Sequence, residues 1–240
     1  MPLAGKGMLI TSMDIDPGDE REFNQWYDRE HLAERVGIEG FLEARRWIAD
    51  DASPQYFCTY STDTFEALNS PAYRQVLANQ TEWSKKNISR FKNMGRVIGR
   101  ITASRGQGRG AALAVVRLRP SGEAPDELRA RIRKDLDPGT LDGIISMHLI
   151  ESDSALSKSL TNPDVDDPGA GDWYILIEGT ELDAVRKVAE TRFKAPGATT
   201  VSIGTYRLMW DLAKSDLQPL HMDRPNHAEA FGRLANGGTT

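Results

Sequence analysis

The sequence has almost no cysteine and no long apolar run, and each absence excludes a class of protein. Cys58 is the only cysteine among 240 residues, so no internal disulfide can form. It lies in an apolar strand pattern, which favours a buried side chain over a nucleophile. No segment approaches the ~18 consecutive apolar residues of a membrane-spanning helix. Residues 1–6 lack the apolar segment of a secretion signal. We therefore expect a cytoplasmic protein with no membrane partner.

Positive charge and metal-binding residues are also scarce. The formal net charge is −5, whereas a surface that binds nucleic acid usually carries a basic stripe. The four histidines are dispersed along the chain and are accompanied by one cysteine, which matches no compact metal-site spacing. We therefore expect no nucleic-acid partner and no metal. Hydrophobic residues make up 39% of the chain, which is ordinary for a globular protein with a buried core.

The order of predicted elements occurs twice. Residues 7–104 read as strand, helix, strand, strand, helix, strand, and residues 111–212 repeat that order in a shorter version. A β-α-β-β-α-β unit forms a ferredoxin-like sheet with both helices on one face. The sequence therefore predicts an α+β protein of two tandem ferredoxin-like repeats, 1–105 and 106–213, followed by a C-terminal tail, 214–240.

The face of each predicted sheet that lacks helices is also apolar. The first strand contains Met8-Leu9-Ile10, and the matching strand of the second repeat contains Leu113-Ala114-Val115-Val116. Such faces must be buried, and packing the two sheets face to face achieves this. The result is a barrel-like sandwich whose interior can hold a small ligand. Residues 104–110 join strand to strand, so their glycines indicate a linker and not a phosphate-binding loop.

Reactive side chains are concentrated on the first helix, predicted to extend from about residue 19 to 36. Helical spacing places Phe23, Trp26, Tyr27, Glu30, His31 and Glu34 on one stripe. The stripe begins apolar and ends with titratable groups, and partial burial tunes such groups for proton transfer near neutral pH. In the matching helix of the second repeat, Leu136 occupies the place of His31, so the imidazole is not a packing requirement of this architecture.

We therefore predict catalytic roles for three of these residues. His31 is the general acid or base, Glu30 is its acidic partner, and Tyr27 donates a hydrogen bond to a substrate oxygen. The alternative for His31 is a structural histidine near a helix C-terminus, bonded to Glu30 or Glu34. Tyr27 can equally pack with its hydroxyl at the rim. Trp26 either belongs to the core or forms a wall of the substrate site.

Three further residues are candidates for substrate binding. Arg45 and Arg46 are neighbours on the second predicted strand, so their side chains point to opposite faces. One of them approaches the barrel interior, where it holds a substrate carboxylate or phenolate or pairs with Glu43 or another local acid. His148 lies on the corresponding strand of the second repeat and is expected to reach the interior as well.

The run Trp26-Tyr27-x-x-Glu30-His31, followed by Gly40-Phe41 and Arg45-Arg46-Trp47, resembles the dimeric α+β barrel superfamily. It is most similar to EthD-like and related tandem members, in which such a helix precedes a P-G-F turn. Glu39 stands where proline is usual. The resemblance covers the first repeat and implies a homodimer. Known activities of the superfamily include cofactor-free monooxygenases, lactone isomerases, decarboxylases, dehydratases and polyketide cyclases, and haem-binding chlorite dismutases.

Residues and resemblance together favour a cofactor-independent acid–base enzyme of the lyase or dehydratase, isomerase or decarboxylase type. Its substrate is a small apolar carbonyl or phenolic compound, and His31 is the acid or base. Two alternatives stay open. One is a haem protein of the chlorite-dismutase type with His148 as the axial ligand. The other is a non-catalytic module for small-molecule binding or assembly.

Overall fold

The computed structural model describes residues 3–121, 125–158, 169–193 and 197–217. The first repeat contains β1 (Gly7–Asp14), α1 (Glu20–Trp26), the π-helical turn η1 (Tyr27–His31), α2 (Leu32–Gly37), β2 (Phe41–Asp51), β3 (Tyr56–Thr62), η2 (Glu66–Asn69), α3 (Pro71–Ala78), α4 (Glu82–Ile88) and β4 (Lys92–Gly106). The second contains β5 (Ala112–Pro120), α5 (Pro125–Asp135), η3 (Pro138–Thr140), β6 (Ile144–Ser152), β7 (Trp173–Gly179), α6 (Leu182–Arg192), β8 (Ala198–Ala213) and η4 (Lys214–Asp216).

The strands form one closed antiparallel barrel in the order β1-β3-β2-β8-β5-β7-β6-β4. Each repeat supplies four neighbouring strands in the ferredoxin-like order, β4-β1-β3-β2 and β8-β5-β7-β6. The long strands β4 and β8 then pair with β6 and β2 of the other repeat. The predicted α+β architecture of two ferredoxin-like units is confirmed. The two sheets are joined by hydrogen bonds into a barrel, which the sequence pattern did not require.

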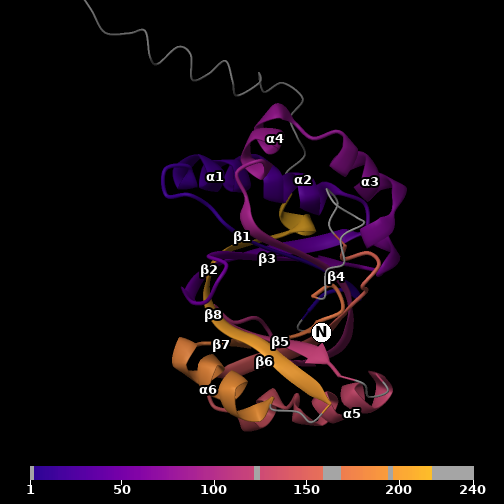
Figure 1. The fold of residues 1–240 in the computed structure, drawn as a ribbon, viewed down its shortest axis with the longest axis vertical. Coiled ribbons are helices and arrows are strands. Elements are labelled where there is room, and N and C mark those ends of the chain that lie inside the picture. Colours follow the sequence, from indigo (N-terminus) through magenta and orange to yellow (C-terminus); the bar gives the residue numbers. More distant parts are fainter. Residues whose placement is uncertain (1–2, 122–124, 159–168, 194–196, 218–240) are drawn as a thin grey trace, which may run out of the picture.

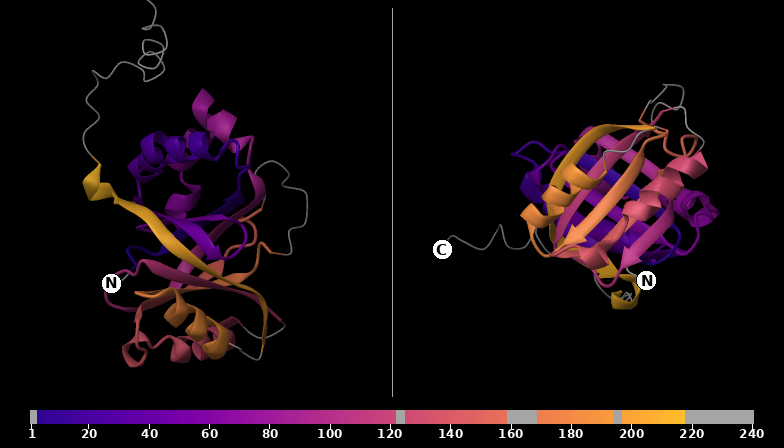
Figure 2. Two further views of the ribbon diagram at one scale, coloured as in Figure 1. Left: turned by 90° about the vertical axis from the view of Figure 1, so that its left-hand side faces the viewer. Right: turned by 90° about the horizontal axis from the view of Figure 1, so that it is seen from below.

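Helices cover the outside of the barrel on two opposite sides. In Figure 1, α1 to α4 lie above the strands of the first repeat, and α5 and α6 lie below those of the second. Figure 2 shows β8 crossing from the lower half to the upper half. Each sheet therefore has an outer face packed against helices and an inner face turned to the barrel interior, and alternate residues of every strand serve one face or the other.

The barrel interior is filled by side chains. Its apolar cluster includes Met8, Ile10, Trp47, Phe57, Leu113, Val115, Ile150, Tyr174, Leu176 and Tyr206. Large aromatic and branched side chains from both repeats meet there and pack against each other, and the ligand space expected in the interior stays a prediction. A second cluster lies between the first sheet and its helices, and a third lies between the second sheet and α5 and α6.

Side-chain caps begin two of the helices, α3 and α4. The hydroxyl of Ser70 accepts a hydrogen bond from the backbone amide of Tyr73 at the start of α3 (3.1 Å), and Thr81 caps α4 in the same way. Asp19 precedes α1 but makes no such side-chain bond. Its carboxylate pairs with Arg90, which lies between α4 and β4 (3.3 Å). The last residue of α2 is Gly37, where the sequence predicts a stop.

The predicted C-terminal tail lies partly outside the described residues. The tail 214–240 is described only as far as residue 217, and it begins with the short turn η4. The predicted boundary between residues 105 and 106 falls in the last two residues of β4. Within the described part of the chain, no helix is long and apolar enough to cross a membrane.

Candidate active site between the π-helical turn and the first sheet

The helix that carries His31 is interrupted by a π-helical turn. The backbone amide of Leu32 donates to the carbonyl oxygen of Tyr27, five residues earlier, and such turns often mark functional sites. Tyr27 and His31 are both buried, and their ring centroids lie 4.9 Å apart. The ring of Trp26 lies 4.2 Å from that of His31. The turn thus directs the aromatic and imidazole groups of the predicted stripe toward the first sheet.

A row of three side chains on the sheet lies in the layer below this turn. Thr11 of β1 is the register partner of Cys58 of β3, and Cys58 is the partner of Arg46 of β2. Residues directly opposite each other on neighbouring strands share a face, and Cys58 belongs to the core between the sheet and the helices. Tyr60 follows two residues later on the same face, with its ring 6.4 Å from that of His31.

Several buried polar atoms of this region have no hydrogen-bond partner among the described residues. They are Thr11 Oγ1, His31 Nδ1, Arg46 Nε and the hydroxyl of Tyr60. We call the residues around them the π-turn cluster: Thr11, Tyr27, His31, Arg46, Cys58 and Tyr60. Folded proteins pair nearly all their buried polar groups, so a group of orphaned atoms on one wall requires an explanation. Thr11, Tyr27 and Arg46 also contact the thiol of Cys58, and the hydroxyls of Tyr27 and Tyr60 contact each other.

Burial controls the protonation of His31. Desolvation, followed by the nearby charges of Arg35 and Arg46, lowers the pKa of His31 well below its ordinary value of 6.5. Burial disfavours the charged form of an imidazole, and a neighbouring cation disfavours it further. The imidazole is therefore neutral at pH 7, and its unpartnered Nδ1 is available as a proton acceptor or a hydrogen-bond donor, depending on the tautomer.

The hydroxyl groups of the cluster stay protonated. Burial raises the pKa of Tyr27 well above its ordinary value and raises that of Tyr60 as well. The Tyr27 hydroxyl makes a long contact to Met13 Sδ (4.0 Å), and it also interacts with the side chains of Cys58 and Tyr60. Burial also raises the pKa of the Cys58 thiol, which agrees with the expectation that this cysteine is not a nucleophile. Both phenols can therefore donate to a substrate oxygen.

The predicted partnership between Glu30 and His31 is not formed. Glu30 Oε1 accepts hydrogen bonds from the hydroxyls of Thr81 (2.5 Å) and Ser84 (3.0 Å), and it thereby connects η1 to α4. Glu34 accepts from Arg35 instead (3.0 Å). The predicted acidic partner is corrected on this point, because the π-helical turn places the Glu30 carboxylate toward the neighbouring helix. Burial and cations, not an acid, determine the ionisation of His31.

Trp26 also bonds to α4. Its Nε1 donates to the hydroxyl of Ser84 (3.1 Å), and the side chain is fully buried. Its ring therefore belongs to the core and lies beside His31, and its role as a wall of a substrate site stays a prediction.

Arg46 is the arginine that faces the helices. Its side chain is fully buried, and its guanidinium carbon lies 4.2 Å from the ring centroid of Tyr27 and 5.0 Å from that of Tyr56. It donates to Asn24 Oδ1 (2.5 Å) and to Asp28 Oδ1 (3.3 Å). The remaining donor, Nε, is one of the unpartnered atoms of the cluster. Among the residues that the structure describes, the carboxylate paired with this cation is that of Asp28, which is half-exposed.

Arg45 points the other way, into the barrel interior, as strand alternation predicts. It forms an ion pair with Glu178 of the second repeat (2.6 Å) and donates to the carbonyl oxygen of Gly110 (2.7 Å). Glu43, the local acid, pairs with Arg109 of the linker. Arg45 is thus neutralised by a carboxylate of the protein, and the residues that join the repeats close this end of the barrel.

His148 lies inside the barrel with both ring nitrogens occupied. Nδ1 is 3.0 Å from the hydroxyl of Ser104, and Nε2 is 3.1 Å from that of Ser146. Burial lowers the pKa of His148 to about 3, with a further contribution from Arg45. A haem iron needs a free imidazole nitrogen that faces an open space. These residues do not fit a haem, and no histidine lies in the described core beneath α5 and α6.

The structure therefore divides the predicted site between two faces of the first sheet. Tyr27, His31, Trp26 and Arg46 lie on the helix side, whereas Arg45 and His148 lie in the barrel interior. The sequence analysis missed four members of the surroundings of His31: Thr11, Arg35, Cys58 as a wall residue, and Tyr60. Period-two alternation places Cys58 and Tyr60 on one face of their strand, but only the strand register brings that face beneath His31.

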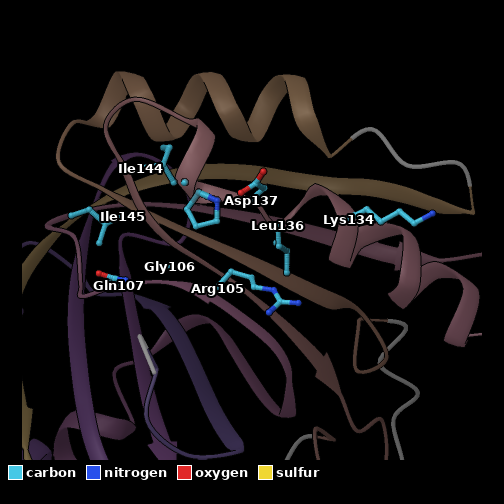
Figure 3. A pocket seen from close by; sticks show the side chains of 10 residues that line it. Arg105, Gly106, Gln107, Lys134, Leu136, Asp137, Ile144 and Ile145 are labelled. Atoms are coloured by element: carbon cyan, nitrogen blue, oxygen red, sulfur yellow. The ribbon is translucent and has the colours of Figure 1, made fainter.

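A surface hollow exists elsewhere on the molecule. It has a volume of about 660 Å³ and lies between the end of β4, the end of α5 and the start of β6. Its lining includes Arg105, Lys134 and Asp137, and in Figure 3 the side chain of Lys134 points away from the other labelled residues. None of the predicted site residues lines this hollow. Its polar groups do not converge, so it is a weaker candidate than the π-turn cluster.

No protein-family model matches the sequence, and no curated protein matches it. Solved structures match over most of its length. A proposed monooxygenase from Lactobacillus acidophilus is 10% identical, with 88% of this chain and 97% of that chain covered and a TM-score of 0.54. An anthrone oxidase-like protein is 11% identical, with 88% and 94% covered and a TM-score of 0.56. A proposed chlorite dismutase is 12% identical, with 85% and 94% covered and a TM-score of 0.52.

The chain has a dimeric α+β barrel fold. The resemblance noted in the first repeat is thus confirmed at the level of the fold, and the second repeat, which lacks the helix motif, shares it. The dimeric α+β barrel supports several unrelated activities, so function has to be argued from the site.

Proposed function

We propose that this protein is a cofactor-independent enzyme that moves a proton on a small, largely apolar carbonyl or phenolic compound bound at the π-turn cluster. One observation supports this most strongly. The unpartnered Nδ1 of His31 is buried beside unpartnered polar atoms of Thr11, Arg46 and Tyr60. A pocket built for substrate leaves its polar groups without protein partners.

Each of these groups has a role in the proposed reaction. The neutral imidazole of His31 accepts a proton from the substrate and returns it later. The phenol of Tyr27 or Tyr60 donates a hydrogen bond to the substrate oxygen, since both remain protonated. The rings of Trp26 and Tyr27 supply apolar walls that exclude water, which strengthens every polar contact at the site.

The substrate enters through a movement of side chains, since the cluster is closed in this structure. Asp28 is an exposed residue at the edge of the π-turn cluster. It accepts a hydrogen bond from Trp210 Nε1 (3.0 Å) and pairs with Arg46 (3.3 Å). Trp210 lies on β8, so the second repeat contributes the outer wall of a site in the first. We place the entrance at this contact.

The proton transfer can be followed by several reactions. Elimination, isomerisation and decarboxylation need no further reactant. The names of similar structures, a monooxygenase and an anthrone oxidase-like protein, favour oxidation by O₂ of the electron-rich anion that forms. Uptake of O₂ during turnover distinguishes the oxygenase from the lyase, isomerase and decarboxylase.

The test is a ligand screen that compares two matched variants. Small phenols, quinones, lactones and hydroxy acids are screened by thermal shift and for turnover with wild type, His31→Asn and His148→Asn. We expect one chemical class to stabilise wild type and His148→Asn and to be transformed by both. His31→Asn should lose the turnover and most of the stabilisation. Equal turnover by His31→Asn and wild type would falsify the assignment of His31.

Cys58 provides an independent measure of occupancy, because it is the only thiol in the chain and belongs to the cluster. A ligand in the proposed site should slow its reaction with a thiol reagent. Ligand binding without turnover of any compound would instead indicate a non-catalytic binding module. The homodimer and the cytoplasmic location expected from the sequence stay predictions.

A further inference from the structure

The guanidinium of Arg46 lies in a cage of three aromatic rings. Its central carbon is 4.2 Å from the ring centroid of Tyr27, 5.0 Å from that of Tyr56 and 5.1 Å from that of Phe23. The faces of aromatic rings attract a cation. The side chain is fully buried, however, and a buried positive charge also needs negative charge close to it. The groups that balance this charge therefore decide what the cation can do in the site.

A chain of hydrogen bonds leads from this guanidinium to a carboxylate at the start of α1. Arg46 Nη2 donates to Asn24 Oδ1 (2.5 Å), and Asn24 Nδ2 donates to the hydroxyl of Tyr56 (3.2 Å). That hydroxyl donates to Glu20 Oε1 (2.5 Å). Because a guanidinium can only donate, the amide oxygen of Asn24 must face Arg46 and the amide nitrogen must face Tyr56. We call Asn24, Tyr56 and Glu20 the Glu20 relay.

The relay runs in one direction, from the cation to the anion. Every donor lies on the Arg46 side of its bond, and hydrogen bonds aligned in this way polarise one another. Burial, followed by the hydrogen bond to Glu20, raises the pKa of Tyr56 to about 12, so its phenol keeps the proton that it donates. Gln55 Nε2 donates to the same Glu20 oxygen (2.9 Å). It lies outside the path to Arg46 and therefore supplies a matched control.

The cations beside His31 are thus paired within the protein. In addition to the relay, Arg46 pairs with Asp28 (3.3 Å), and Arg35 pairs with Glu34 (3.0 Å). The other polar groups of the cluster are uncharged at neutral pH, since burial keeps the imidazole neutral and the phenols and the thiol protonated. A charged substrate would lose its hydration here without gaining a counter-charge, whereas an uncharged substrate of the same shape would not.

We propose, building on the function proposed above, that the π-turn cluster selects an uncharged substrate because the Glu20 relay holds Arg46 as part of the wall of the site. An aromatic alcohol, aldehyde, ketone or amide fits this site, and the matching carboxylate is rejected. Asn24 is the residue that determines this selectivity, since its amide joins the guanidinium to the phenol of Tyr56. Without that amide, Arg46 keeps Asp28, whose side chain is 51% exposed and screened by solvent. The cation then becomes available to a carboxylate ligand.

The first experiment tests the relay without a ligand. NMR of arginine-labelled protein measures how fast the Nε proton of Arg46 exchanges with solvent, with the signal assigned by its absence from Arg46→Lys. We expect Asn24→Leu to speed this exchange by about tenfold or more, because a hydrogen bond to a charged group is lost. Asn24→Asp, which keeps an acceptor for the guanidinium, should restore slow exchange, and Gln55→Leu should leave it unchanged.

Tyr56→Phe is the second relay variant, since it removes the hydroxyl and keeps the ring of the cage. It should speed the exchange of the Arg46 proton in the same direction as Asn24→Leu and by a smaller factor. Exchange within about twofold of wild type in both Asn24→Leu and Tyr56→Phe would overturn the relay. Because this experiment uses no ligand and no turnover, its outcome is independent of the function proposed above.

The second experiment tests the selectivity with two probes of nearly the same shape, 4-hydroxybenzamide and 4-hydroxybenzoate. We expect wild type to bind the amide at least about tenfold more tightly at pH 7, because the carboxylate loses its hydration. Protection of the Cys58 thiol from a thiol reagent reports that the probe occupies the cluster. Asn24→Leu should reduce the preference by about fivefold or more through tighter binding of the carboxylate, and Gln55→Leu should keep it.

Each result decides a different claim. Equal or tighter binding of the carboxylate by wild type overturns the proposed selectivity and leaves the function proposed above in place. The same preference in Asn24→Leu and wild type overturns the role of Asn24. If neither probe protects Cys58, the proposed site fails, and the selectivity fails with it, while the Arg46 exchange still decides whether the relay forms.

Discussion

His31 and Leu136, which the sequence pattern aligns between the two repeats, are both buried against the outer face of a sheet, His31 at the end of the π-helical turn and Leu136 directly after α5. Leu136 packs with the apolar residues beneath α5. His31 instead leaves Nδ1 without a partner among the described residues. The same architecture therefore accommodates an apolar side chain where the first repeat keeps a polar one, at a cost in stability that a function of His31 would explain.

Replacing His31 by leucine should separate stability from function. The variant removes an unpartnered buried polar group, which costs about 1–3 kcal/mol. We expect the free energy of unfolding in urea to rise by about 1 kcal/mol or to stay unchanged, while turnover and ligand binding are lost. His148→Leu is the matched contrast, since it leaves Ser104 and Ser146 unpaired and should destabilise the protein. A large loss of stability in His31→Leu would show that the imidazole has a structural role.

The pH dependence of unfolding should also identify His31. Its pKa is lowered by burial in the folded protein, so the unfolded chain takes up a proton near pH 6.5 while the folded protein does not. Stability is therefore complete above pH 6.5 and is lost as the pH falls below it. We expect the advantage of His31→Leu over wild type to grow by about 1.4 kcal/mol per pH unit below 6.5. Parallel stability curves for the two proteins would contradict a lowered pKa.

The ion pair between Arg45 and Glu178 should couple the two repeats. Both side chains are about 97% buried, so removal of one partner leaves a buried charge and costs about 3–5 kcal/mol. We expect Arg45→Met to show this loss and Arg45→Met/Glu178→Met to recover most of it. Urea unfolding of the four proteins of this double-mutant cycle gives the coupling energy directly. Additive losses would mean that the pair is not formed in solution.

Glu30 should be dispensable for the chemistry. Its carboxylate accepts from Thr81 and Ser84, and the amide oxygen of Glu30→Gln can accept the same bonds. We expect this variant to bind ligand within about twofold of wild type, since the Glu30 carboxylate is not among the groups that shift the pKa of His31. Glu30→Ala should loosen α4 and lower the melting temperature. A strong loss of turnover in Glu30→Gln alone would restore the acidic partnership expected from the sequence.

Structural features that depend on residues close together in the sequence could be predicted. The alternation of Arg45 and Arg46 follows from strand geometry, and the cap at Ser70 follows from its position before Pro71. The partners of these residues could not be predicted. Glu178 meets Arg45 only because β2 pairs with β8 and the barrel closes, and register between distant strands is not encoded in a local pattern.

The π-helical turn is the second feature that the sequence could not reveal. Tyr27 and His31 are four residues apart, a spacing that equally suits an ordinary α-helix. Glu30 bonds to Thr81 and Ser84 and not to His31, and the sequence of this helix alone does not contain those distant partners. Small local departures from helix geometry thus decide the chemistry of a site while leaving the fold unchanged.

The contact between Asp28 and Trp210 should control access to the cluster. Cys58 is fully buried beneath it, so a thiol reagent reaches the sulfur only when the site opens. Trp210→Ala removes the indole that bonds to Asp28 and should speed the labelling of Cys58 by at least about fivefold, because the lost bond is worth about 1 kcal/mol or more. Trp83→Ala is the control, since it removes an indole of α4 that the proposed entrance does not use. Equal acceleration by both variants would mean that Cys58 is exposed by general loosening of the helical layer, and the entrance would then have to be sought elsewhere. Faster labelling of Cys58 in Trp210→Ala alone, reversed by a bound phenol, would support the proposed entrance. It would also support the contribution of Trp210, a residue of the second repeat, to that entrance.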